Sequence, residues 1–208
     1  MSAFISFEGP DGGGKSLQAG YLEEDLASAG LAVLLTREPG GTRISDQIRK
    51  VLTLLENTDM DPLTEFLLFS ASRAQHVSEL IRPELVAGRI VLCDRFFDSS
   101  LAYQGYGQGL DLEMLRAVTR FATGGLVPDL TLLFDIDVEQ GLRRRESAGN
   151  WNRLDAYDVE FHARVRRGYH ALVTEEPQRW IVLDASQDPE TVRGKVRDSV
   201  LKFLAERD

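Results

Sequence analysis

The sequence contains almost no cysteine and no long hydrophobic run. Cys93 is the only cysteine among 208 residues, so no disulfide can form within the chain. No stretch approaches the roughly eighteen apolar residues of a membrane-spanning helix, and no basic segment leads into an apolar one at the N-terminus. We therefore expect a cytoplasmic protein with no membrane partner, in which Cys93 is an inert core residue.

An excess of basic residues is also missing. The 24 lysines and arginines face 33 aspartates and glutamates, and the net charge of −9 disfavours a surface that binds a nucleic-acid polymer. The three histidines are scattered without the spacing of metal ligands. Length and near-average composition, 43% hydrophobic and 27% charged, favour one globular domain over residues 1–208.

Short apolar runs alternate with segments of helical periodicity along the chain. We expect strands at 3–8, 32–35, 89–94, 130–135 and 180–184. We expect helices directly after the first glycine cluster and at 45–55, 62–81, 112–121, 138–145, 159–173 and 189–204. This alternation predicts an α/β fold with a parallel five-stranded sheet flanked by helices, whose ligands bind beyond the carboxyl ends of the strands.

The segment from Gly9 to Ser16 reads GPDGGGKS and matches the phosphate-loop pattern G-x-x-x-x-G-K-[ST]. It follows an expected strand and precedes an expected helix, the context in which such a loop binds phosphate rather than serving as a plain glycine turn. Glycines let backbone N–H groups face phosphate oxygens, Lys15 reaches the β and γ phosphates, and Ser16 can hold Mg²⁺.

Two other nucleotide-binding classes are disfavoured. The pattern G-x-G-x-x-G of dinucleotide enzymes fails because Leu17 stands where its last glycine belongs. No asparagine is followed by lysine, so the guanine-reading N-K-x-D of GTPases is missing. A small-molecule kinase and an ATP-driven motor or regulator remain.

Two further features of the sequence are groups of charged residues that could belong to the expected site. Asp94 and Arg95 end an expected strand, where they can hold Mg²⁺ and a phosphate or simply cap the strand. Residues 141–170 contain seven arginines and four acidic residues, which fits either a substrate-facing segment or a solvated helical face.

With these motifs in place, the sequence closely resembles the thymidylate kinase family over essentially the whole chain. The resemblance lies in FEGPDGGGKS, TREPGGT at 36–42, LLFSASRAQH at 67–76, DRFFDSSLAYQG at 94–105 and NRLD at 152–155. It implies a three-layer P-loop kinase fold with an arginine-bearing lid at about 141–155. The implied reaction moves the γ-phosphoryl of ATP, with Mg²⁺, to dTMP and yields dTDP and ADP for dTTP synthesis.

The resemblance also implies roles for individual residues. Phe69 would stack on thymine, Arg73 and Gln104 would bond its polar edge, and Ser99 and Ser100 would shape the base pocket. Asp11 and Tyr103 would face the sugar at its 3′-OH and its 2′ edge. Glu38 would lie near the acceptor phosphate and metal, and Arg49 and Arg95 would clamp that phosphate.

For ATP the resemblance implies contacts from Gly9, Pro10, Asp11, Gly12, Gly13, Gly14, Lys15, Ser16 and Arg143. Ser16 and Asp94 would serve the metal. The phosphate loop offers no basic residue before Gly14, so the family pattern places the catalytic cation in the lid among Arg143, Arg144, Arg145 and Arg153. We select Arg153, which with Lys15, Arg95 and Asp11 completes the expected catalytic set.

Some expectations stay open at this point. Ser72 stands where many family members have aspartate beside the base-binding arginine, so another group must orient Arg73. A kinase for a different acceptor, or a regulator that binds nucleotide without turnover, is the alternative function. The resemblance implies a homodimer, with 62–81 as a candidate interface, and the loop at 184–187 is a candidate adenine site.

Overall fold

The computed structural model describes residues 2–147, 149 and 153–207. A five-stranded sheet in the order β2-β3-β1-β4-β5 forms its centre, and every pairing between neighbouring strands is parallel. The strands are β1 (Ala3–Glu8), β2 (Val33–Arg37), β3 (Ile90–Asp94), β4 (Leu130–Asp135) and β5 (Trp180–Asp184). The expected α/β fold is confirmed, and each strand lies within two residues of its expected range.

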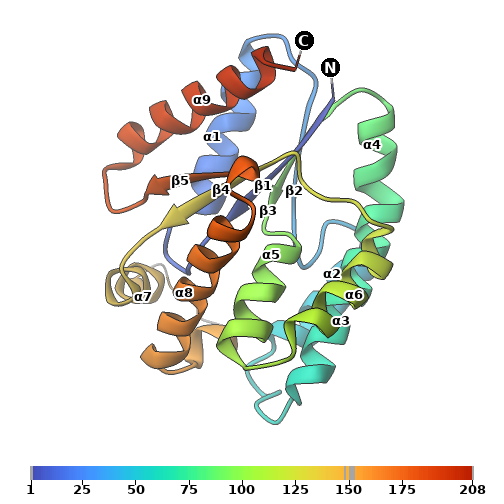
Figure 1. Ribbon diagram of the computed structural model, residues 1–208, viewed down its shortest axis with the longest axis vertical. Helices are drawn as coiled ribbons and strands as arrows, with labels where there is room; N and C mark the ends of the chain where they lie inside the picture. The colour runs from blue at the N-terminus through green and yellow to red at the C-terminus, as the bar shows by residue number, and fades with distance from the viewer. Residues whose placement is uncertain (1, 148, 150–152, 208) are drawn as a thin grey trace.

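The helices lie on both faces of the sheet (Figure 1). The longer ones are α1 (Lys15–Ser28), α2 (Arg43–Thr53), α3 (Pro62–His76), α6 (Leu112–Thr123), α7 (Val138–Ser147), α8 (Val159–Glu175) and α9 (Pro189–Ala205). Short helical segments are η1 (Val77–Ile81), α4 (Arg82–Val86), α5 (Phe97–Ser100), η2 (Leu101–Gly107), η3 (Arg153–Ala156) and η4 (Pro177–Arg179).

Alternation along the central strand β1 creates the two cores. Ala3, Ile5 and Phe7 join the apolar faces of α1 and α9, whereas Phe4 packs with residues of η1 and β3. A second cluster on that opposite face joins α3, η2, α6 and α8. Because β1 is buried throughout, its carboxyl end delivers the phosphate loop from a rigid position.

Local sequence signals explain where several helices begin. Asp61 accepts hydrogen bonds from the amides of Leu63 and Thr64, and Asp188 accepts one from the amide of Thr191. In both helices a proline follows the cap, at a position where its missing N–H costs nothing. These caps fix the starts of α3 and α9 at the residues that the sequence pattern indicates.

The expected helix over 62–81 is interrupted near its end. Residues 77–81 form the wide turn η1, and the chain then continues as α4 to Val86. Pro83 supplies the reason, because it has no N–H to donate and its ring crowds the carbonyl one turn earlier. None of the helices in the described ranges is long and apolar enough to cross a membrane.

Candidate functional site

The phosphate loop connects β1 to α1 and depends on glycine. Gly9, Gly12 and Gly14 all have positive φ, at 136°, 78° and 80°. A Cβ on Gly12 would lie 2.1 Å from the carbonyl oxygen of Gly141, and one on Gly9 would lie 2.5 Å from that of Phe134. The loop therefore closes against β4 and α7, a fit that only glycine allows at these positions.

Lys15 bridges its own loop. Its Nζ donates to the carbonyl oxygens of Gly9, at 3.0 Å, and Pro10, at 2.7 Å. Burial and the neighbouring Arg95 charge lower the pKa of Lys15 to about 8, although Asp11 and Asp94 oppose the shift. An anionic ligand at the helix start would offset both effects, and no side chain caps the N-terminus of α1.

A cavity of about 460 Å³ opens beside this loop. It brings together every residue expected to contact dTMP: Asp11, Glu38, Arg49, Phe69, Arg73, Arg95, Ser99, Ser100, Tyr103 and Gln104. Gly12, Gly14, Lys15, Ser16 and Asp94 line it too, whereas Gly9, Pro10 and Gly13 belong to the loop behind the cavity wall. Segments far apart in sequence thus converge beyond the carboxyl ends of the strands, as the parallel sheet predicts.

One end of the cavity is organised around Arg73, whose side chain is 1% exposed. Its Nε donates to Glu38 at 2.7 Å, and its Nη2 donates to Ser100 Oγ at 3.1 Å and to the carbonyl oxygen of Phe96 at 3.3 Å. Its Nη1 is buried and finds no partner among the described residues. A guanidinium held this firmly leaves one buried donor without a partner in a residue that lines the cavity.

Glu38 is the group that orients Arg73 in this chain, where Ser72 stands in place of the aspartate of many family members. Besides Arg73, its carboxylate lies 3.0 Å from Nδ1 of His76, and Nε2 of His76 lies 2.8 Å from Oγ1 of Thr36. Arg73 is therefore oriented by Glu38 across the fold rather than by its sequence neighbour. Glu38 was expected near the acceptor phosphate and the metal; it lines the cavity, and its side-chain partners among the described residues are Arg73 and His76.

A second cluster joins the phosphate loop to β3. Arg95 has φ 69°, a left-handed conformation that is strained for an arginine. Its Nη2 donates to Asp11 at 2.6 Å, and Tyr103 donates to the other oxygen of Asp11 at 2.5 Å. Burial alone would raise the pKa of Asp11, but the charges of Arg95 and Lys15 and the Tyr103 hydroxyl hold it well below its usual range. Asp11 is thus an ionised hydrogen-bond acceptor.

Glu8 lies directly beneath this cluster and is fully buried. It accepts hydrogen bonds from the amide of Phe96 at 2.7 Å, from Ser99 at 2.5 Å and from Tyr169 at 3.0 Å. Burial and the nearby Asp98 raise the pKa of Glu8 to about 7. The sequence analysis missed Glu8, because at the end of an apolar strand it looks like the first polar residue of a loop.

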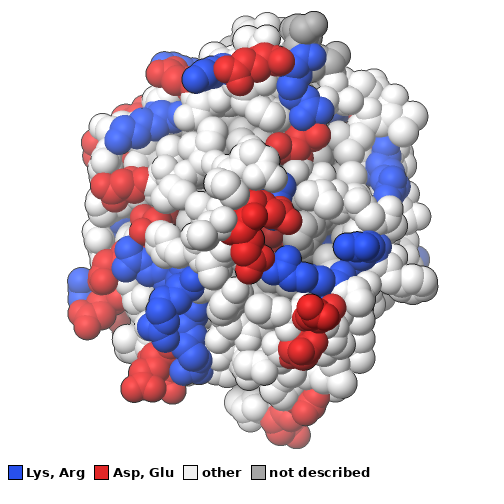
Figure 2. Space-filling view, viewed as in Figure 1, with Lys and Arg blue, Asp and Glu red and all other residues white. Residues whose placement is uncertain are grey.

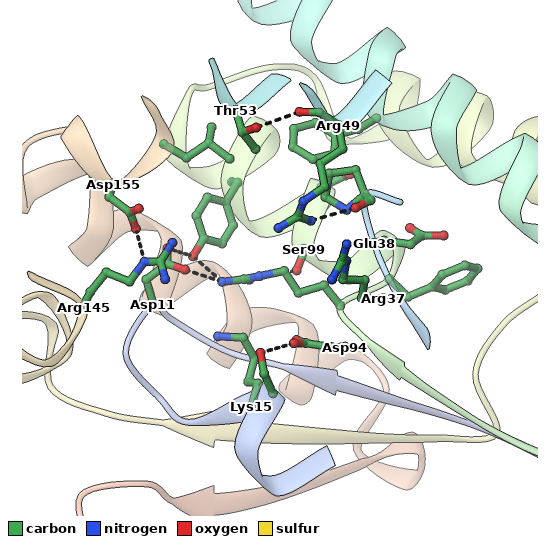
Figure 3. Close-up of a pocket in the computed structure, with 18 of the residues that line it drawn as sticks. Asp11, Lys15, Arg37, Glu38, Arg49, Thr53, Asp94, Ser99, Arg145 and Asp155 are labelled. Atoms are coloured by element: carbon green, nitrogen blue, oxygen red, sulfur yellow. Dashed lines mark hydrogen bonds and ion pairs between the residues drawn. The ribbon is translucent and has the colours of Figure 1, made fainter. Parts of the chain in front are cut away.

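Cationic side chains reach the cavity from several elements. Figure 3 shows Lys15 of α1, Arg37 of β2 and Arg49 of α2 pointing into the same space. Burial, together with the charge of Arg37, lowers the pKa of Arg49, whose Nη1 donates to the carbonyl oxygen of Pro39 at 2.7 Å. Arg37 was also missed, although it belongs to the quoted TREPGGT segment. This convergence of positive charge suits a phosphate group.

Ser16 and Asp94 form the oxygen-rich part of the cavity. The Ser16 hydroxyl donates to Oδ2 of Asp94, so both side chains lie side by side. Among the described residues no group of three or more potential ligands could hold a metal ion. A hydroxyl and a carboxylate without further protein ligands fit Mg²⁺ that arrives with nucleotide phosphates, since this ion keeps water and phosphate oxygens as ligands.

The expected lid arginines occupy different environments. Arg145 and Arg144 line the cavity; Arg145 donates to Asp155 at 3.0 Å, and Arg144 donates to the carbonyl oxygens of Ala185 and Ser186. Arg143 is exposed and pairs with Glu139. Arg153 is buried, pairs with Glu65 and donates to the carbonyl oxygen of Leu52, and it is not part of the described cavity wall.

Residues 148 and 150–152, within the expected lid, lie outside the described residues, as does the first residue of the quoted NRLD segment. On the face shown in Figure 2, acidic and basic side chains are interspersed, with a basic group at the lower left over α7 and α8. The basic excess of 141–170 is thus divided between cavity, buried ion pairs and surface.

Comparisons with known proteins agree with this geometry. The family model described as thymidylate kinase matches residues 7–196. The thymidylate kinase of Roseiflexus castenholzii is 52% identical, covering 99% of this chain and 95% of the relative, and that of Deinococcus radiodurans is 50% identical, covering 93% of each.

A crystal structure of thymidylate kinase from Ehrlichia chaffeensis superposes with a TM-score of 0.77 at 35% identity, covering 98% of both chains. Sequence, sheet topology and the walls of the cavity thus lead to one assignment: the chain belongs to the thymidylate kinase family, which uses ATP to phosphorylate dTMP to dTDP.

Proposed function

We propose that the cavity holds dTMP with its base toward Arg73 and Gln104 and its phosphate toward Arg37, Arg49 and Arg95. The observation that carries this proposal is the buried, unpaired Nη1 of Arg73, one donor without a partner among the described residues. A buried donor left unpaired is costly, and the O4 carbonyl of thymine would satisfy it. Phe69, half-buried beside it, supplies an aromatic face for the ring.

The sugar lies between these two ends in the proposed complex. Asp11, held ionised by Arg95 and Lys15, accepts a hydrogen bond from the 3′-OH. The ring of Tyr103 stands against the 2′ edge and disfavours a ribonucleotide by its bulk. Ser99 keeps its hydrogen bond to Arg95, and Ser100 keeps its hydrogen bond to Arg73. Both serines thus shape the pocket without binding the ligand themselves.

The 5′-phosphate of dTMP needs no protein base, because its second pKa is about 6 and its attacking oxygen is ionised at neutral pH. The obstacle is repulsion between two polyanions. We assign its relief to Lys15, Arg37, Arg49 and Arg95, which bring positive charge to one cavity. ATP would bind along the loop from Gly9 to Ser16, with its phosphates at the start of α1.

Ser16 and Asp94 are the residues proposed to hold Mg²⁺ with its water shell. When bound, the ion supplies charge neutralisation on the phosphates. Before that, the Ser16 hydroxyl donates to Asp94, which keeps both oxygens at the entrance of the phosphate loop.

The lid would exclude water and add positive charge over the transferred group. The sequence analysis assigns that charge to Arg153, with Arg143 on ATP, and both remain predictions. Arg145 is the alternative that the cavity wall supports, because it lines the same space as Asp11 and Lys15. In that role the Arg145 guanidinium would bind both Asp155 and the nucleotide.

We further propose that the chain is one domain and acts in the cytoplasm as a homodimer. Leu63 and Leu67 of α3 and Phe121 of α6 support a dimer face, since they are 43%, 47% and 90% exposed on helices that pack together. Light scattering of Phe121→Asp against the unaltered chain tests this assembly, which predicts a shift from dimer mass to monomer mass.

The test of the substrate assignment is acceptor-dependent ADP release by purified protein with ATP and Mg²⁺. The acceptor panel is dTMP, dUMP, dCMP, TMP with a ribose sugar, dGMP and thymidine. A strong preference for dTMP supports the base and sugar contacts together. Equal use of the ribonucleotide would contradict the role of Tyr103, and equal use of dCMP would contradict the roles of Arg73 and Gln104.

A further inference from the structure

Glu65 is a fully buried carboxylate on α3 that does not itself line the described cavity. It accepts hydrogen bonds from three side chains. Its Oε1 accepts from Nε2 of Gln104 at 2.7 Å and from Nε2 of Gln108 at 2.8 Å, and its Oε2 accepts from Nη2 of Arg153. A buried carboxylate that does not line the described cavity thus holds the side chains of Gln104, Gln108 and Arg153 in place.

The carboxylate fixes the direction of the Gln104 amide. A carboxylate oxygen accepts hydrogen bonds but donates none, so Gln104 must turn its NH₂ group toward Glu65. Gln104 is 2% exposed and lines the cavity, so the atom it offers to a ligand is its carbonyl oxygen. The amide cannot reverse without placing two oxygens against each other in a buried site.

Arg153 determines which oxygen of Glu65 is left to bind the glutamine amides. Its guanidinium pairs with Oε2 of Glu65 and is held in place by the carbonyl oxygen of Leu52 at 3.0 Å. Oε2 therefore faces a fixed cation, which leaves Oε1 for the two glutamine amides. Burial of both partners of this ion pair makes the orientation costly to change.

Two residues that line the cavity consequently carry an unpaired donor and a fixed acceptor. Arg73 supplies the unpaired donor Nη1, and Ser100, which binds the same guanidinium, lies four residues before Gln104 on one helical segment. Thymine presents a carbonyl O4 next to N3–H, the complement of this pair. Cytosine presents an amino group next to an unprotonated nitrogen, the reverse pattern.

We propose that Glu65 is a positioning residue that sets pyrimidine specificity by locking the Gln104 amide with its oxygen toward the base. The proposal rests on the dTMP-binding function proposed above. It assigns no contact between Glu65 and substrate, and it gives Arg153 the role of aligning Glu65.

The decisive variant is Glu65→Gln, which keeps shape and removes charge. The Arg153 guanidinium can only donate hydrogen bonds, so the new amide turns its carbonyl oxygen toward Arg153 and its NH₂ toward Gln104. Gln104 then reverses and presents NH₂ to the base. We expect the ratio of kcat/KM for dTMP to that for dCMP to fall at least about tenfold, mainly through a higher KM for dTMP.

Gln108→Met is the matched control. It removes the second amide on Oε1 of Glu65, and Gln108 does not line the described cavity. The dTMP to dCMP ratio should stay within about twofold of the parent, because the polarity of Gln104 is unchanged. An equal loss of discrimination in Gln108→Met would attribute the effect to general packing and overturn the proposal.

A swapped pair, Glu65→Gln with Gln104→Glu, separates polarity from stability. The carboxylate at position 104 accepts from the new amide and offers its other oxygen to the base, so preference for dTMP over dCMP should recover by several-fold. Unchanged preference in Glu65→Gln, or no recovery in the swapped pair, overturns the proposal. A parent protein without any preference for dTMP over dCMP would instead contradict the proposed base contacts themselves.

Discussion

The two ends of the cavity differ in how far their polar groups already have protein partners. At the acceptor end, Arg73 is 1% exposed and Gln104 is 2% exposed, and both are held by buried carboxylates. At the donor end, Lys15 donates to carbonyls of its own loop, and Arg143 of the expected lid is 69% exposed and pairs with Glu139 at 3.4 Å.

This difference indicates that recognition and catalysis are prepared differently. The acceptor end obtains its geometry when the chain folds, so base binding in the proposed complex would require little rearrangement. In the proposed complex, Lys15 at the donor end exchanges its bonds to loop carbonyls for bonds to phosphate. Variants at the acceptor end should therefore alter KM for dTMP, and variants at the donor end should alter kcat.

The largest expected effect is at the donor end. Lys15→Ala removes the cation expected to face the phosphates and one of the donors to the carbonyls of Gly9 and Pro10. We expect kcat to fall by roughly 10²–10³-fold, with KM for dTMP changed by less than about threefold. Steady-state kinetics with dTMP varied at saturating ATP measures both. A rise in KM that exceeds the loss in kcat would erase the distinction between the two ends.

The next effect is at the acceptor end. Arg73→Lys keeps a positive charge for Glu38 but removes the planar Nη1 donor. We expect KM for dTMP to rise about 10–100-fold, with kcat within about threefold of the parent. Thermal unfolding checks that the variant is folded. Unchanged KM in a folded variant would contradict base recognition by Arg73.

The sequence predicted the frame of the molecule well, since the strands are continuous apolar runs and the helices carry aspartate caps and apolar faces. It gave no periodic signal for the helical segment 97–107. Its buried positions include the polar residues Asp98, Ser100 and Gln104; Ser100 and Gln104 line the cavity, and Asp98 pairs with Arg179. Hydrophobic periodicity fails where the buried face is polar.

The sequence also could not predict which residues far apart in the chain contact each other. No spacing in the sequence links Glu38 to Arg73, Glu65 to Arg153 or Glu8 to Tyr169, because 35, 88 and 161 residues separate these pairs. The family resemblance named residues that would touch substrate, and the cavity collects the expected dTMP contacts. It named Glu38 for a different role and did not name Glu8 or Glu65, whose partners only the fold brings into contact.

A smaller effect distinguishes the lid arginines. Arg145 lines the cavity, so Arg145→Ala should lower kcat about 10–30-fold with little change in KM for dTMP. Arg153→Ala leaves Glu65 buried without its cation, so it should lower the melting temperature and raise KM for dTMP. The exposed Arg167→Ala serves as the control for lost positive charge.

The kinetic parameter that changes decides between these two arginines. A large loss of kcat in Arg153→Ala, with KM for dTMP and melting temperature preserved, would return the catalytic role to Arg153 as the sequence analysis predicts. A loss confined to Arg145→Ala would place the donor-side cation on the cavity wall.

The smallest effect concerns Glu8, the buried carboxylate that accepts hydrogen bonds from Phe96, Ser99 and Tyr169. Burial and the nearby Asp98 raise its pKa from an ordinary 4.5 to about 7, so between these pH values the folded state holds a proton that the unfolded state has lost. Stability from this group is complete below pH 4.5 and is lost as pH rises through 7. Glu8→Gln mimics the protonated form at every pH. The melting temperature of the parent, relative to this variant, should therefore fall by a few degrees, roughly 5 °C, between pH 5 and pH 8. A constant difference across that range would mean that Glu8 is already ionised when it binds Ser99 and Tyr169, and its hydrogen bonds would then belong to the charged network around Arg95.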